Sequence, residues 1–102
     1  MAVDLYEVRG NAQAFIDAIV RMTPKEKEQV PTVSYAQNFN NVLELAKEVA
    51  PHVDGRIWPA AICFDQPVGY GVIATTRYSE IETYSRQIVN LLPDEPLLPS
   101  RG

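Results

Sequence analysis

Cys63 and His52 are the residues of this sequence whose side chains could act as a nucleophile and a base. A catalytic Cys–His pair needs hydrogen-bond contact and a third group that orients the base, and nothing in the spacing of the chain enforces this. Cys63 also lies between Ile62 and Phe64, a setting typical of a cysteine that packs as a small hydrophobic residue. We therefore expect no catalytic residue.

A metal or cofactor site is not indicated either. One Cys and one His cannot supply the four ligands of a structural zinc without carboxylates. A single cysteine also excludes a disulfide within the chain. Gly69 and Gly71 fall inside a predicted strand, so neither a phosphate-binding loop nor a dinucleotide fingerprint is present. We expect no metal and no cofactor.

The residues around Arg77 form the candidate ligand-binding site. A strand that leads into a helix N-terminus exposes free N–H groups, which together with hydroxyls and a guanidinium suit a phosphate or a carboxylate. Nearby tyrosines could line an apolar pocket with hydroxyl tips. The alternative is that these residues are helix caps, a surface arginine and core aromatics, and this reading is favoured. The candidate residues are Thr75, Thr76, Arg77, Ser79, Tyr70 and Tyr78.

The longest apolar stretch, residues 57–75, reads IWPAAICFDQPVGYGVIAT and predicts a central hairpin of two buried strands. Both faces of the first strand are apolar, which is typical of a strand covered on both sides or placed in a dimer interface. The candidate interaction residues here are Trp58, Ile62 and Phe64. The amide-rich helix face of Gln37, Asn38, Asn40 and Asn41 suits a polar protein interface, although a solvated face is the favoured interpretation.

The other elements follow from periodicity and capping signals. Residues 3–8 alternate weakly and indicate a possible N-terminal strand; a helix running through Gly10 is the competing interpretation and costs about 1 kcal/mol. Capping patterns predict helices that begin after Asn11, Thr23, Ser34 and Ser79. The second of these is short, because Pro31 stops it.

These elements predict an α+β fold in which three main helices cover a small antiparallel sheet. We expect one globular domain over residues 1–92 and a Pro-rich extended tail over 93–102. Leu97 and Leu98 indicate that the tail docks on a surface, with a disordered terminus as the alternative.

The charge balance, nine Lys and Arg against thirteen Asp and Glu, argues against nucleic-acid binding. No stretch predicts a membrane span or a signal peptide, so a cytoplasmic location is expected. The sequence therefore favours a small soluble non-catalytic interaction or assembly protein, acting as a homodimer or with another protein partner. The alternative is a small-molecule or anion-binding domain, or a small enzyme, with a pocket near Tyr70, Arg77 and Tyr78.

Overall fold

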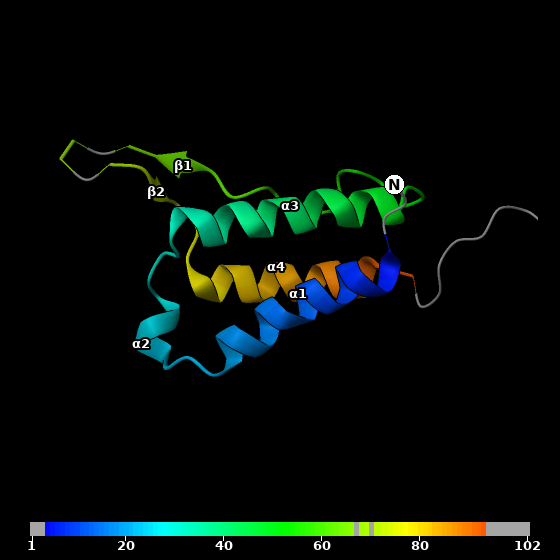
Figure 1. Cartoon of the computed structure of the whole chain (residues 1–102), viewed down its shortest axis with the longest axis horizontal. Helices are drawn as coiled ribbons and strands as arrows, with labels where there is room; N and C mark the ends of the chain where they lie inside the picture. The colour runs from blue at the N-terminus through cyan, green and yellow to red at the C-terminus, as the bar shows by residue number, and fades with distance from the viewer. Residues whose placement is uncertain (1–3, 67, 70, 94–102) are drawn as a thin grey trace, which may run out of the picture.

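The computed structural model describes residues 4–66, 68–69 and 71–93. Within them the chain forms four helices and a small antiparallel sheet, an α+β arrangement dominated by helices (Figure 1). The elements in order are α1 (Leu5–Val20), α2 (Pro24–Lys27), α3 (Val33–Val49), β1 (Phe64–Asp65), β2 (Ile73–Ala74) and α4 (Tyr78–Leu91).

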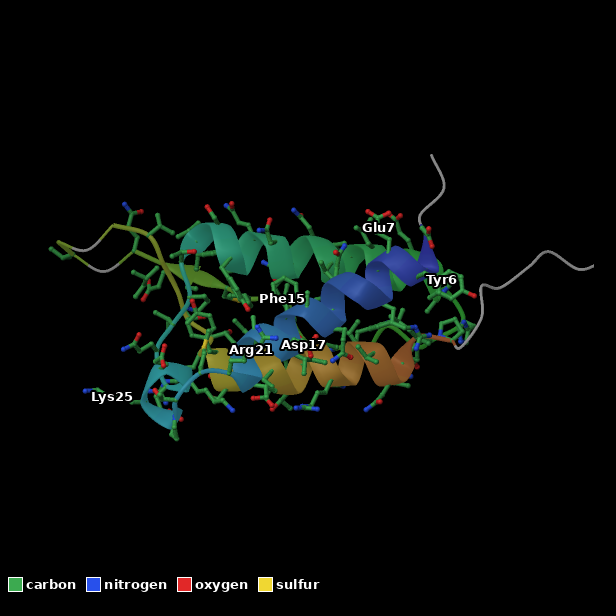
Figure 2. The ribbon with its side chains drawn as sticks, turned by 60° about the horizontal axis from the view of Figure 1, so that its bottom comes forward. Tyr6, Glu7, Phe15, Asp17, Arg21 and Lys25 are labelled. Carbon is green, nitrogen blue, oxygen red and sulfur yellow. The ribbon has the colours of Figure 1, made fainter. Side chains whose placement is uncertain are left out.

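Residues 5–8 are helical, so the predicted strand over residues 3–8 is wrong; Val3 lies outside the described residues. The Tyr6 N–H donates to the Asp4 carboxylate at 2.9 Å, which caps α1 six residues before Gly10. Leu5, Val8 and Ala12 are all buried at helical spacing, while Tyr6 lies exposed at the first turn (Figure 2). Fully burying an aliphatic side chain gains about 1.5–3 kcal/mol, so burial of Leu5 and Val8 outweighs the cost of a helical glycine.

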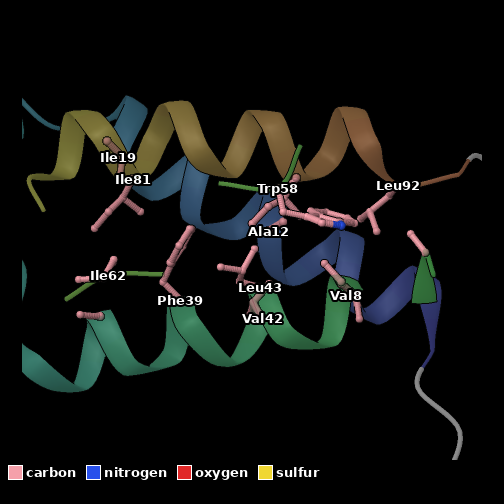
Figure 3. Close-up of a cluster of buried hydrophobic side chains, with 14 of the residues drawn as sticks. Val8, Ala12, Ile19, Phe39, Val42, Leu43, Trp58, Ile62, Ile81 and Leu92 are labelled. Carbon is pink, nitrogen blue, oxygen red and sulfur yellow. The ribbon is translucent and has the colours of Figure 1, made fainter. Parts of the chain in front are cut away.

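The three long helices lie alongside one another, and their apolar stripes meet in a single core (Figure 3). Helix α1 packs against both α3 and α4, and its contact with α4 is the more extensive. The Arg9 guanidinium also donates to the Pro93 carbonyl, which ties the start of α1 to the end of α4. The largest apolar side chains of this core that are fully buried are Val8, Ile19, Phe39, Leu43, Ile81 and Ile88.

The predicted buried hairpin over 57–75 exists only as a short ladder. Phe64 pairs with Ala74 and Asp65 with Ile73, and the residues before Phe64 form no strand. Trp58 and Ile62 pack into the helical core at 7% and 3% exposure, whereas Val68 is 98% exposed. The prediction fails because the helices bury one another's apolar faces. The apolar run therefore adds only individual side chains to a core that consists mainly of helix residues. We call residues 64–74 the arm; it projects beyond the start of α3 (Figure 1).

Two of the predicted helix starts are displaced by two residues. The Tyr35 N–H donates to Thr32 Oγ1 at 3.2 Å, so Thr32 rather than Ser34 caps α3. Helix α4 begins at Tyr78 with Arg77 at the cap position, so Ser79 is not the cap. The capping box that opens α2 is confirmed, with reciprocal Thr23 and Glu26 bonds. Asn11, by contrast, lies inside α1.

Candidate functional site

The side chain predicted to bind an anion, Arg77, already lies between carboxylates. Its Nη1 is 3.3 Å from Glu28 Oε2, and its backbone N–H donates to Glu80 Oε1 at 3.2 Å. The next N–H, of Tyr78, donates to the Gln29 carbonyl at 3.0 Å. An added phosphate or carboxylate would therefore meet two negative groups and a backbone donor that is already in use.

The two threonines before Arg77 belong to the base of the arm. Thr75 donates to the Cys63 carbonyl through both its N–H, at 3.1 Å, and its Oγ1, at 3.0 Å. Thr76 and Ser79 are half-buried, and the Ser79 carbonyl accepts from Thr83 Oγ1 at 3.2 Å. These contacts stabilise the hairpin and the first turn of α4. Tyr70 lies outside the described residues.

The predicted interaction residues separate into buried and exposed members. The Asn40 amide donates to the Ile62 carbonyl at 3.0 Å and accepts from the Ile62 N–H at 2.7 Å. Ile62 and Trp58 are thereby part of the chain's own core, and Phe64 alone of the three is exposed, on the arm. Leu97 and Leu98 lie outside the described residues.

Cys63 and His52 are both exposed, so the expected packing of Cys63 as a small hydrophobic residue is wrong. The thiol points back to the Ala61 carbonyl at 3.9 Å. It is exposed because Ile62 takes the neighbouring core position and the chain then leaves the bundle toward the arm. In the described part of the chain, no cluster of three His, Cys, Asp or Glu side chains is placed to hold a metal ion.

A groove lies on the surface between α1 and α3. Its volume is about 450 Å³. Phe15 points between the two helices (Figure 2), and with Val42 and Leu45 it provides apolar surface. Amides of Asn11, Asn38 and Asn41 border it. The nine lining residues, which define the α1–α3 groove, are Asn11, Ala14, Phe15, Ala18, Tyr35, Asn38, Asn41, Val42 and Leu45.

A cluster of aromatic rings packs at the base of the groove. Phe15 meets Tyr35 edge-on at 5.2 Å between ring centroids and meets Phe39 at 5.9 Å. Tyr35 in turn meets Tyr78 edge-on at 5.2 Å. Such edge-to-face pairs add to simple burial. The packed rings thus hold Phe15 in place under the groove.

The Tyr35 hydroxyl is the unusual polar group of this cluster. Its oxygen is buried without a hydrogen-bond partner among the described residues. Burial, and secondarily the neighbouring Tyr78, raise the pKa of Tyr35 to about 12. A tyrosine phenol is neutral at physiological pH even at its ordinary pKa of about 10, so Tyr35 contributes apolar ring surface rather than charge to the groove.

Sequence reasoning identified only one wall of the groove. Asn38 and Asn41 belong to the amide-rich face predicted on α3, whereas the facing residues of α1 belong to no predicted surface. The available signal was the spacing of Asn11, Ala14 and Ala18, which places three small or polar residues on one exposed helix face. That signal is weak, because exposed alanines are common in helices for their propensity alone.

Comparison with protein-family models, curated proteins and solved structures found no match to this chain. Among the described residues, no helix is both long and apolar enough to cross a membrane.

Proposed function

We propose that this chain is a non-catalytic assembly protein that works through protein contacts, in the first place as a homodimer. The observation that carries the proposal is the α1–α3 groove. It is a hollow of about 450 Å³ with apolar surface from Phe15, Val42 and Leu45 and a border of uncharged amides. Protein interfaces combine an apolar centre with a polar rim in this way.

The arm supports a protein contact independently. Its Phe64, Val68 and Val72 are exposed, the last at 50%. Both of its strands are edge strands, which carry backbone groups able to pair with another chain. Exposed apolar side chains on and beside an open ladder favour a protein partner over a soluble ligand.

A small amphipathic ligand in the same groove is the second candidate. The groove volume falls within the range of about 300–1,000 Å³ that is usual for small-molecule sites, and three Asn amides offer directed hydrogen bonds. The earlier alternative, an anion near Arg77 and Tyr78, is less favoured because Glu28 and Glu80 lie beside the guanidinium group and the backbone N–H of Arg77.

The cellular setting belongs to the same proposal. An exposed thiol at Cys63 is compatible with a reducing compartment, where free cysteines persist without forming intermolecular disulfides. We therefore place the protein in the cytoplasm.

The test is the molar mass of the full chain, measured by light scattering after size exclusion over a wide range of protein concentration. A mass that rises from one subunit to two supports the assembly proposal. A mass of one subunit at every concentration, together with thermal stabilisation by an amphipathic compound from a fragment library, contradicts it and favours the small-ligand alternative.

A further inference from the structure

We propose that the α1–α3 groove binds the same face of a second copy of this chain, with the two α1 helices antiparallel across a two-fold axis near Ala14. This inference rests on the proposed function and names the surface that the homodimer would use. A two-fold interface pairs one patch with itself, so the patch must be self-complementary in shape and in charge.

The charges at the ends of the groove have this self-complementarity. Glu7 lies four residues before Asn11 and Arg21 lies three after Ala18, so both extend the stripe of α1 that lines the groove. Figure 2 shows Glu7 and Arg21 toward opposite ends of the helix. Within the part of the chain that the structure describes, neither side chain takes part in an ion pair.

The position of Ala14 determines which charged residues of the two subunits face each other. It lies seven residues after Glu7 and seven before Arg21. A two-fold axis at Ala14 therefore places Glu7 of each subunit opposite Arg21 of the partner subunit. The dimer contains this pair twice, whereas a parallel arrangement would place like charges together.

Helix α3 adds negative charge at the same end of the groove as Glu7. It runs antiparallel to α1 (Figure 1), so its C-terminal Glu48 lies toward the Glu7 end of the groove. Glu48 is exposed and follows Leu45 by three residues on the groove side. One end of the face is thus acidic and the other carries Arg21, and a second copy turned by a half-rotation matches acid with base.

The shape of the face also suits a close helix contact. Ala14 and Ala18 are exposed and line the groove, so a facing helix can approach without displacing long side chains. Alanine also loses no rotamer freedom when it is buried. The larger Phe15 and Leu45 then supply apolar area beside the contact.

The size of the face predicts a weak and reversible dimer. Two helices of this length, about 25 Å long and roughly 20 Å wide when side by side, offer a footprint of about 500 Å² per subunit. The total of about 1,000 Å² is at the low end of specific interfaces. We expect subunit exchange to be fast enough for mixing experiments.

Charge reversal tests the pairing directly. We would measure the dimer dissociation constant by sedimentation equilibrium for the wild type, for Glu7→Arg, for Arg21→Glu and for an equimolar mixture of both variants. Each variant alone places like charges opposite each other twice and should weaken the dimer roughly tenfold or more. The mixture restores both opposite-charge pairs and should recover wild-type affinity.

Arg56→Glu is the matched control, since it makes the same change of charge at an exposed loop position. It should leave the dissociation constant unchanged. A wild-type dimer that is insensitive to both groove variants would overturn this surface and leave the proposed function standing. Variants that weaken the dimer but fail to recover on mixing would overturn the antiparallel pairing. A wild type that is monomeric throughout would overturn both proposals.

Discussion

Asn40 shows how one side chain joins the helical bundle to the segment that leads into the arm. Its amide pairs with both the N–H and the carbonyl of Ile62, as a neighbouring strand would. This holds Ile62 at its core position without a sheet. The residue belonged to the amide-rich face noticed in the sequence, but its role is structural rather than interfacial.

Replacing Asn40 with alanine should lower the free energy of unfolding by roughly 2 kcal/mol, because two backbone groups of Ile62 lose their partner in a partly buried setting. Urea unfolding followed by circular dichroism measures this. Asn41→Ala, at the exposed border of the groove, is the control and should change stability by less than about 0.5 kcal/mol. Equal losses in the two variants would contradict the structural role of Asn40.

Tyr35→Phe should stabilise the protein by about 1 kcal/mol at pH 7, because it removes a buried hydroxyl without a partner. The pKa of Tyr35 is raised by burial from about 10 to about 12, so the folded state keeps a proton that the unfolded chain loses. The associated stability is complete below about pH 10 and is lost as the pH rises toward 12.

The measurement for Tyr35 is the difference in unfolding free energy between wild type and Tyr35→Phe from pH 8 to 12. The advantage of the variant should grow above pH 10. A constant difference across the range would mean that the phenol titrates normally in the folded protein.

At the scale of elements, local signals predicted the helices and failed for the strands. The Thr23–Glu26 capping box and the stripe through Phe39, Leu43 and Ala46 are short-range patterns, and the structure has both. Which apolar stretch is buried in the core depends on packing between elements that are far apart in the sequence. Residues 57–63 look like a buried strand, yet only Trp58, Pro59 and Ile62 are buried, because the helix surfaces leave room for just those side chains.

The sequence does not predict the groove either, because the groove also depends on long-range packing. Its two walls come from helices that are separated by α2 and two loops, and only their packing brings Ala14 and Asn41 to the same groove. Asn40 and Asn41 look alike in sequence, but one turns toward Ile62 and the other toward the groove. The rotation of α3 about its own axis decides between these roles, and the amide pattern alone does not report it.

Gly10 offers a test of the corrected first helix. Gly10→Ala should raise the free energy of unfolding by about 0.5–1 kcal/mol, because alanine favours helix and its Cβ would meet nothing within 4 Å. Gly69→Ala is the opposing control, since its φ of +86° strains any residue with a side chain, and it should destabilise. Thermal unfolding of both variants measures this. Destabilisation by Gly10→Ala would contradict a continuous α1.

The whole molecule combines a well-packed bundle with an arm that adds only Ala74 to the core. The buried side chains come mainly from α1, α3 and α4, together with anchors such as Trp58 and Ile62. On the arm, Ala74 is buried while Val68 and Val72 face solvent. Substitutions at the exposed Val68 and Val72 can therefore be made without disturbing the core.

This separation predicts a clear contrast between two variants. The double substitution Val68→Lys with Val72→Lys should change the free energy of unfolding by less than about 0.5 kcal/mol, since both side chains are exposed. Ile81→Ala, at a fully buried position between the helices, should cost about 2–5 kcal/mol through lost burial and the cavity left behind. Urea unfolding of both measures this. A loss of similar size in the arm variant would mean that the arm is part of the cooperative core. It would then support the central buried hairpin that the sequence predicts.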